Sequence, residues 1–406
     1  MTVTANGGGE LPLAGLRVVE VAHYVAVPSA GTLLADLGAE VVKIEPPRGE
    51  VYRRSRPRYA GYASEFPENP AFHMDNRGKQ CLALDITRPE ARHAILRLID
   101  RSDIFLTNLL PKRRRKYGFD HETLLARRPS LIVAAINGYG LGGDRADQPA
   151  FDYTAYWART GLMDGMRDVG VPPSMQRPAV GDHAAGSNLV CAILCALRLR
   201  DADGKGRYVE TYLLQTGLHV HGTDVTTALV TGEAVKRHDR TATANPLWNS
   251  YPVAGDRWLV LVMIEPDRYW ERLCRALERP DLGADPRFAD GFSRAEHARV
   301  LIAELEASFA LRTLEVWGER LDAAGIIWAH VLRADEATLD PQVRAMGYLR
   351  TVEHETGPIE TVGPPFQIEG LRLGAGAAAS PVNRDAHRIF REVGLKDAEI
   401  DRLLRD

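Results

Sequence analysis

The chain has 406 residues, of which 45% are hydrophobic and 26% charged, values typical of a globular protein that buries a large core. Its 51 Lys and Arg residues nearly balance 54 Asp and Glu residues, so the formal charge of −3 creates no field that attracts nucleic acid or an anionic membrane. Continuous apolar runs stay far below the ~20 residues of a membrane span. The four cysteines include no C-x-x-C pair, which suits a cytoplasmic protein without disulfides or structural zinc.

Residues 1–11 contain three consecutive glycines and no apolar core, a pattern that predicts a disordered tail. The following apolar runs alternate with amphipathic segments, which predicts strands joined by helices and hence a Rossmann-like parallel sheet covered on both faces. The first turn lacks the G-x-G-x-x-G of a dinucleotide site. The predicted strands are 16–21, 40–44, 81–86, 103–107, 131–136 and 208–212, and the predicted helices are 29–39, 89–99, 154–163 and 186–200.

The pattern changes near residue 245, where aromatic strand-like segments are followed by amphipathic ones. These predict a smaller α+β domain with helices at 266–277, 294–309 and 314–324. Strand-like segments at 359–362 and 366–371 and a charged helix at 384–405 complete the chain. We therefore expect a large α/β domain at 12–225, a linker and the small domain at 226–335, and a second linker with a return to the large domain at 336–406.

The segment Gly181-Asp182-His183 stands just before the small residues AAGSN and a predicted helix. An aspartate in this place often serves as an N-cap. The same position suits a carboxylate nucleophile, because the positive end of the helix dipole keeps the carboxylate ionised and the amides of residues 181–185 could hold an oxyanion. The residues alone leave both interpretations open.

Two other charged features lie near predicted turns. Asp152 precedes the aromatic stretch YTAYW and is either another helix cap or part of the site. The run KRRRK at 112–116 is either a solvated helix face or a patch for the phosphates of a nucleotide-bearing substrate. His183, His219 and His221 lack a carboxylate spaced to complete a metal site, so we expect core or rim histidines and no metal.

Five blocks of the sequence carry a family resemblance. They are LAGLRVVEVAHYVAVPSAGTLLADLGAEVVKIEPPRGE, NRGKQCLALDITRPEAR, SDIFLTNLLPKRRRKYGFD, RRPSLIVAAINGYGLGG and GDHAAGSNLVCAILCALRLRDADGKGRYVETYLLQTGL. In this order they resemble the family III CoA-transferases, the group of the formyl-CoA, carnitine and phenyllactate CoA-transferases. The resemblance runs from about Pro12 to the C-terminus, and it implies an enzyme that moves CoA between an acyl-CoA and a free carboxylic acid and that keeps no cofactor permanently bound.

The resemblance also assigns roles to residues. It makes Asp182 the nucleophile, which forms an aspartyl anhydride and then an aspartyl-CoA thioester, and it makes Asp152 a neighbour that orients or tunes the site. It further implies an interlocked homodimer of two ring-like chains. The residues that it places against coenzyme A are Val25, Ala26, Leu84, Asp85, Thr87, Asn108, Leu109, Leu110 and Lys116.

The related α-methylacyl-CoA racemases are the alternative. They use the equivalent aspartate together with a histidine in a G-H-D segment, whereas this chain has Ala150-Phe151-Asp152. Phenylalanine cannot carry a proton, so the resemblance favours the transferases over a CoA-ester isomerase. Among the transferases, the stretch FDYTAYWARTGLM together with GDH is most similar to members that act on 2-hydroxy acids, aryl acids and bulky carboxylates.

Overall fold

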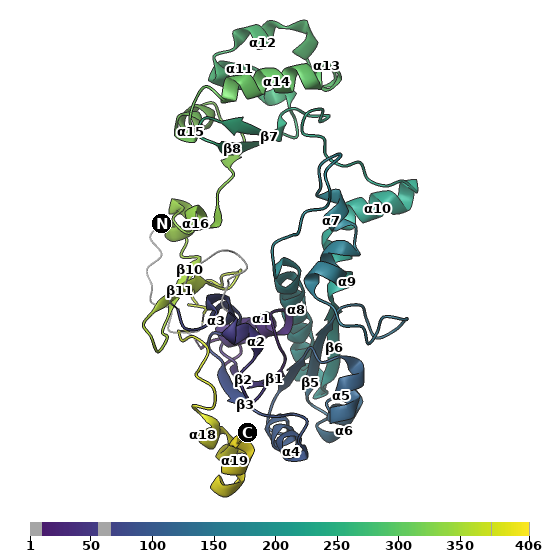
Figure 1. Cartoon of the computed structure of the whole chain (residues 1–406), viewed down its shortest axis with the longest axis vertical. Helices are drawn as coiled ribbons and strands as arrows, with labels where there is room; N and C mark the ends of the chain where they lie inside the picture. Colours follow the sequence, from purple (N-terminus) through teal and green to yellow (C-terminus); the bar gives the residue numbers. More distant parts are fainter. Residues whose placement is uncertain (1–9, 56–65, 375, 406) are drawn as a thin grey trace. The chain divides into compact units, whose positions relative to one another are not determined.

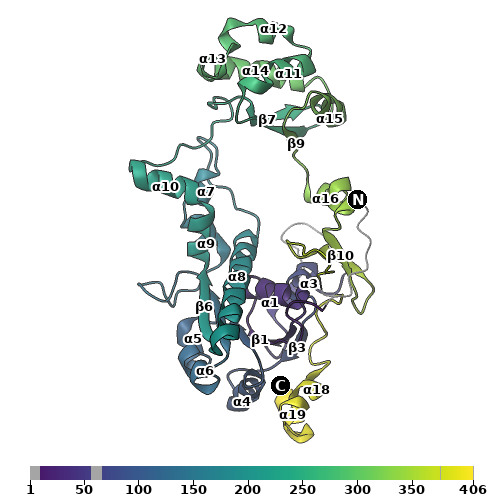
Figure 2. The same ribbon diagram turned by 180° about the vertical axis from the view of Figure 1, so that it is seen from behind.

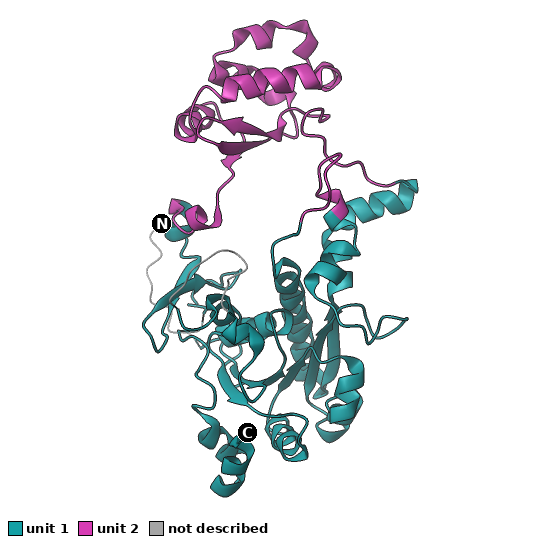
Figure 3. Ribbon diagram, in the orientation of Figure 1, with its two compact units in different colours: residues 1–163, 175–233, 342–406 teal, residues 164–174, 234–341 magenta. Residues whose placement is uncertain are grey.

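The computed structural model describes residues 10–55, 66–374 and 376–405. The chain divides into two compact units (Figure 3): the first contains residues 1–163, 175–233 and 342–406, and the second contains residues 164–174 and 234–341. The segment 164–174, which the sequence pattern placed in the large domain, thus clusters with the second unit. Of the tail predicted over residues 1–11, residues 1–9 lie outside the described residues.

A six-stranded parallel sheet forms the centre of the first unit (Figure 1). β4 and β5 are buried along their whole length, because helices cover both faces of the sheet, and this is why they appear in the sequence as continuous apolar runs. The predicted α/β fold with a parallel sheet is confirmed. In the spatial order β3-β2-β1-β4-β5-β6, the strands are β3 (Gln80–Ala83), β2 (Glu40–Glu45), β1 (Arg17–Val21), β4 (Ile104–Thr107), β5 (Ile132–Asn137) and β6 (Arg207–Tyr212).

Helices cover the two faces of this sheet in separate layers. One core lies between the sheet and the helices α1 (Ala26–Asp36) and α8 (Val180–Asp203), which pack on each other, as Figure 2 shows from behind. The core on the opposite face is built by α4 (Pro89–Ile99), α6 (His121–Arg127), α18 (Ala386–Glu392) and α19 (Asp397–Leu404). The other elements of this unit are α2 (Val51–Arg54), α3 (Pro70–Asn76), α5 (Pro111–Tyr117), the π-helix η2 (Tyr153–Ala158), α9 (Leu213–Val220), α10 (Gly222–Thr231), β10 (Leu349–Val352) and β11 (Ile359–Val362). The short helices α7 (Leu162–Gly165) and α17 (Pro341–Ala345) span the points of the chain where one unit ends and the other begins.

The second unit has an α+β composition and its own hydrophobic core. An antiparallel sheet of β7 (Trp248–Val253), β8 (Arg257–Val262) and β9 (Trp328–His330) packs against helices whose apolar faces include Trp270 and Trp317. The helices are α11 (Asp267–Leu277), α12 (Pro280–Ala284), the 3-10 helix η3 (Pro286–Phe288), α13 (Gly291–Glu296), α14 (Ala298–Phe309), α15 (Leu314–Ala323) and α16 (Ala334–Ala337).

Several predicted elements differ from the structure. The helix predicted at 384–405 is divided into α18 and α19, because Gly394 adopts a left-handed backbone (φ 83°) after the first of them. The helix predicted at 294–309 is likewise divided into α13 and α14, and the segment 366–371 forms no strand. The helix predicted at 154–163 is replaced by η2 and α7, and α8 begins at Val180 instead of residue 186.

Helix α8 is also, among the described residues, the one helix that is long and apolar enough to cross a membrane by length and composition. Polar residues such as Asp182, Asn188 and Arg198 interrupt its apolar sequence, so no continuous run was visible. Its buried residues, including Leu189 and Ile193, belong to the core on the α1 face of the sheet. Core helices of globular units pass the same test, and burial accounts for part of the apolar composition of α8, while residues such as Leu194 and Leu199 are exposed.

Candidate active site at the start of helix α8

Two glycines allow the first turns of α8 to approach neighbouring segments closely. A Cβ added at Gly181 would lie 2.7 Å from Cδ1 of Tyr156, and one at Gly186 would lie 2.9 Å from the carbonyl oxygen of Ala26. Both distances are shorter than van der Waals contact, so a side chain would force the backbones apart. The start of α8 is therefore held between η2 and the start of α1.

Helix α8 begins without a side-chain cap of its own. Its N-cap residue is Ala179, which has a left-handed backbone (φ 69°) that residues with a side chain rarely adopt. Asp182 is the third residue of the helix, so its interpretation as the N-cap is wrong. The sequence suggested that the amides of residues 181–185 could hold an oxyanion. The N–H of His183 is not free for this role, because it donates to the carbonyl of Ala179 at 2.9 Å.

Asp152 brings a second carboxyl group to the start of α8, besides Asp182 in its first turn. Its side chain is buried, and burial raises its pKa. This effect outweighs the N–H groups of Tyr153, Gly181 and Ala179, which face the carboxylate and lower the pKa. Asp152 thus faces the starts of both η2 and α8. The sequence left it open whether Asp152 caps the helix that follows it or belongs to the site.

Asp182 itself is partly buried, and its pKa is raised to about 7. Burial is the main cause and the charge of Asp152 adds to it, while His183 opposes the shift. The helix dipole predicted an ionised carboxylate at neutral pH, whereas burial and the charge of Asp152 shift the pKa of Asp182 in the opposite direction. A carboxyl group with a pKa so close to neutrality is typical of a functional site.

His183 connects the start of α8 to helix α3. Its Nε2 lies 2.8 Å from Oδ1 of Asp75, a buried residue of α3, and the hydroxyl of Tyr52 donates to Oδ2 of Asp75 at 3.3 Å. Burial disfavours the charged ring, but the hydrogen bond and charge of Asp75 outweigh it and raise the pKa of His183. Sequence reasoning missed Asp75 because α3 was not predicted, although an Asn-Pro pair marks its start.

Aromatic side chains from several segments meet next to these charged groups. Tyr24, in the turn after β1, packs edge-on against Phe151 with ring centroids 5.4 Å apart, and it lies 6.5 Å from the ring of Tyr52. Its backbone is left-handed (φ 62°), a strained conformation that is common at functional turns. Tyr24 is 44% exposed and Phe151 is 53% exposed, so this aromatic rim of Tyr24, Phe151 and Tyr52 offers an apolar surface to a bound molecule.

The structure brings two of the predicted coenzyme A segments together at the carboxyl ends of β1 and β4. These strands are neighbours at the point where the strand order changes direction, which is the usual ligand crevice of such sheets. The Asn108 side chain accepts a hydrogen bond from the N–H of His23 at 3.1 Å and donates one to its carbonyl at 2.7 Å. Asn108 thereby fixes the turn that carries Val25 and Ala26, both of which are buried.

The segment after β3 lies at the same edge of the sheet but two strands from β1. Leu84 is buried there, whereas Thr87 is exposed. Asp85 accepts hydrogen bonds from the N–H (2.9 Å) and the hydroxyl (2.7 Å) of Thr87, which close a local turn. The structure therefore does not place Leu84, Asp85 and Thr87 directly beside the turn after β1.

The remaining predicted residues follow β4. Leu109 is buried, Leu110 precedes α5, and Lys116 is exposed near the end of α5. The basic run 112–116 makes up most of this short helix. It is not a uniform solvated face, because Arg114 is buried and donates to a tyrosine hydroxyl of β6 at 2.9 Å.

One cluster in the described residues has donor atoms close enough to hold a metal. Glu68, His73 and His354 bring one ligand atom each to within 4.8 Å of one another. The carboxylate of Glu68 already accepts from the guanidinium of Arg53 at 3.1 Å and lies 2.9 Å from Nε2 of His73. Because a permanent cation occupies the carboxylate, we assign the cluster to an ion-pair network.

The parallel sheet and the crevice between β1 and β4 define an α/β fold with a ligand crevice at the carboxyl ends of its strands. The chain belongs to CoA-transferase family III, whose family model matches residues 13–386. It is therefore a CoA-transferase, an enzyme that moves CoA between a thioester and a carboxylic acid. The resemblance found in the sequence is confirmed.

Three similar proteins show how far this relationship extends. The (R)-2-hydroxy-4-methylpentanoate CoA-transferase of Clostridioides difficile is 28% identical over 96% of this chain and 97% of its own length. The cinnamoyl-CoA:phenyllactate CoA-transferase of Clostridium sporogenes is 29% identical over 97% of this chain and 96% of its own length. The crystal structure of a CAIB/BAIF family protein from Brucella suis is 27% identical, covers 95% of this chain and 100% of its own, and has a TM-score of 0.86.

Proposed function

We propose that Asp182 is the nucleophile of CoA transfer and that Asp152 positions it by holding the start of α8. The observation that carries this proposal is the placement of Asp182: a partly buried carboxylate in the first turn of α8, held between η2 and the start of α1, beside a second carboxylate. The pKa of about 7 leaves a large ionised fraction at neutral pH. It also makes the carboxylate a stronger base than an ordinary aspartate, which favours attack on a carbonyl.

The proposed reaction has four steps, and the CoA thiolate that one step releases is the nucleophile of the next. The Asp182 carboxylate attacks the thioester carbonyl and expels CoA thiolate, which leaves a mixed anhydride. The thiolate attacks the aspartyl carbonyl of this anhydride, releases the donor acid and forms an aspartyl-CoA thioester. The acceptor carboxylate attacks the aspartyl thioester and again expels the thiolate, which finally attacks the acceptor carbonyl and frees Asp182.

CoA is a substrate in this scheme, and we place it along the carboxyl ends of the strands. Val25 and Ala26 lie at the crevice between β1 and β4 with Asn108, Leu109 and Leu110 on the other side. The exposed ammonium of Lys116 supplies charge for phosphate groups. Leu84, Asp85 and Thr87 lie at the same edge of the sheet, two strands away, where an extended nucleotide portion can reach them.

Chemical trapping tests the nucleophile directly. When acyl-CoA and then hydroxylamine are added to the wild-type enzyme, we expect a hydroxamate at Asp182, because both the anhydride and the thioester are activated aspartyl carbonyls. Mass spectrometry of the peptide that contains residue 182 detects the product, and a sample without acyl-CoA serves as the control. Label at Asp152 would show that the nucleophile has been assigned to the wrong carboxylate.

The aromatic rim favours a bulky acyl group, such as that of an aryl or branched 2-hydroxy acid. Tyr24 and Phe151 expose their rings beside the segment that carries Asp152, and an aromatic or branched acyl chain gains by covering them. We expect Phe151→Ala to lower kcat/KM for phenyllactate as acceptor roughly tenfold, as about 1–2 kcal/mol of lost contact predicts. The value for succinate should change little. Equal losses for both acids would contradict this substrate class.

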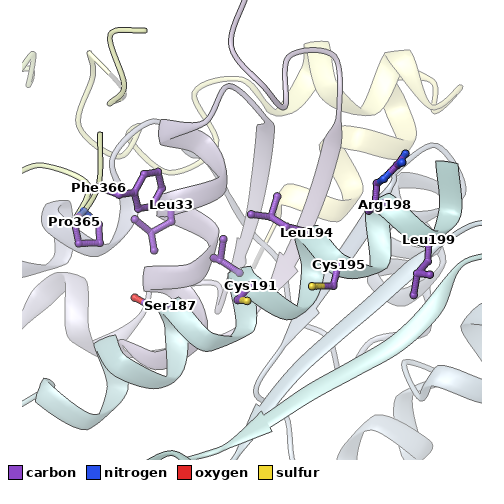
Figure 4. Close-up of a pocket in the computed structure, with 10 residues that line it drawn as sticks. Leu33, Ser187, Cys191, Leu194, Cys195, Arg198, Leu199, Pro365 and Phe366 are labelled. Atoms are coloured by element: carbon purple, nitrogen blue, oxygen red, sulfur yellow. The ribbon is translucent and has the colours of Figure 1, made fainter. Parts of the chain in front are cut away.

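We also propose a cytoplasmic homodimer, in which a second copy covers the exposed apolar side of α8. Figure 4 shows Cys191, Leu194, Cys195 and Leu199 along this side, where they line a groove of about 730 Å³ that also contacts Phe366. Light scattering should give twice the chain mass of 44.8 kDa, and both thiols should react with maleimide more slowly in native than in unfolded protein. An active monomer with fully reactive thiols would contradict the dimer.

A further inference from the structure

The surroundings of Asp182, the nucleophile proposed above, disfavour its ionised form. Asp182 is partly buried, and the buried carboxylate of Asp152 and the carboxylate of Asp75 both disfavour its ionisation. Attack on a thioester requires the ionised form. The one positive partner facing Asp182 among the described residues is its own neighbour His183, whose side chain is about a third exposed. The state of this imidazole therefore determines how much of the enzyme is ready to react.

The geometry around His183 favours the charged ring. Nε2 is held at 2.8 Å from Oδ1 of Asp75, and Oδ2 of Asp75 accepts from the hydroxyl of Tyr52 at 3.3 Å, so the carboxylate is fixed from both sides. Asp75 is 2% exposed, which strengthens its attraction for a cation. This arrangement resembles the carboxylate–histidine pairs in which the carboxylate orients the ring and stabilises the imidazolium.

We propose that Asp75 and His183 form a positioning pair that promotes the ionisation of Asp182: Asp75 holds His183 as the imidazolium, and the imidazolium charge stabilises the Asp182 carboxylate. This inference rests on the proposed function of Asp182. Charged and titratable groups from three segments take part, namely Asp152 before η2, Asp75 on α3, and His183 on α8 itself. Tyr52 on α2 donates its hydroxyl to Asp75, and Tyr156 on η2 lies near the charge of Asp152.

The pH dependence of kcat/KM separates this role from others. For the wild type, activity should rise with pH through a midpoint near 7, because Asp182 reacts as the carboxylate. His183→Gln removes the positive charge, so the midpoint should move up by about one unit, with about a tenfold loss below it and full activity at alkaline pH. His183→Arg keeps a positive charge opposite Asp75, and its midpoint should stay near that of the wild type.

For Asp75→Asn, the direction in which the pH midpoint of kcat/KM moves tests the proposal. The negative charge of Asp75 by itself disfavours ionisation of Asp182, so its direct removal would move the midpoint down. The proposal predicts the opposite, a midpoint that moves up, because His183 loses the partner that keeps it protonated. Circular dichroism checks the fold of this variant, and the His183 variants test the proposal on their own if Asp75→Asn does not fold.

His387→Gln is the matched control. His387 also lies within reach of carboxylates, 3.6 Å from Asp397 and 3.3 Å from Asp401, but on the exposed surface of α18 and α19, and its removal should leave the profile unchanged. An unchanged midpoint in His183→Gln, or an equal loss at every pH, would overturn the pair's role. Hydroxylamine trapping of His183→Gln at alkaline pH separates the role of the pair from the assignment of the nucleophile. Label at Asp182 in this variant would support Asp182 as the nucleophile, whatever the pH midpoint shows about the pair.

Discussion

Asp182→Asn should abolish CoA transfer and at the same time stabilise the fold at about pH 8. An amide is no nucleophile for a thioester, so turnover is lost. Folding raises the pKa of Asp182 from 3.8 to about 7, which means that the folded chain keeps a proton that the unfolded chain releases. Stability therefore falls as pH rises between these two values, by on the order of a few kcal/mol. Asparagine does not carry this penalty, and calorimetry should show a higher Tm than the wild type at about pH 8.

The gain in Tm should shrink toward about pH 5, where the wild-type carboxyl is protonated in the folded state. Asp224→Asn is a close control, because Asp224 is also the third residue of a helix, α10, but has a side chain that is 41% exposed. It should keep full activity and a Tm close to that of the wild type. If Asp182→Asn retains even a tenth of wild-type transfer, Asp182 is not the nucleophile.

The sheet of the first unit could be predicted because burial on both faces leaves a direct trace in the sequence. β5 (Ile132–Asn137) is buried at every position, and its apolar run stands between polar turns. α4 (Pro89–Ile99) was also predicted with its observed bounds, since proline at its first position and a regular apolar stripe mark it. Tertiary contacts decided the elements that were missed: η2 is a π-helix, a conformation with no distinct sequence pattern.

Only the part of the candidate site that is local in the sequence could be predicted. The Gly-Asp pair could be found because Gly181 and Asp182 are adjacent in the chain and resemble a known motif. The partners of Asp182 come from distant segments: Asp75 precedes His183 by 108 residues, and Tyr52 joins them from α2. Likewise, the elevated pKa of Asp182 depends on burial and on Asp152, neither of which local spacing reveals.

Gly181→Ala should lower both stability and activity, although alanine normally favours a helix over glycine by about 1 kcal/mol. The added Cβ would lie 2.7 Å from Cδ1 and 2.8 Å from Cβ of Tyr156, which is buried and cannot turn away freely. Such overpacking costs about 1–3 kcal/mol. Relief requires the start of α8 or η2 to shift, and either movement separates Asp182 from Asp152. A displacement of about 1 Å can lower the rate roughly 100-fold.

Measurements of Tm and of kcat/KM test this expectation, with Gly222→Ala as the control. Gly222 is the first residue of α10, as close to a helix start as Gly181, and a Cβ there would meet nothing within 4 Å. Gly222→Ala should therefore keep full activity and leave Tm unchanged or slightly raised. The two glycines thus predict opposite signs for the same substitution. A Gly181→Ala variant as stable and active as the wild type would mean that the contact with Tyr156 does not position the nucleophile.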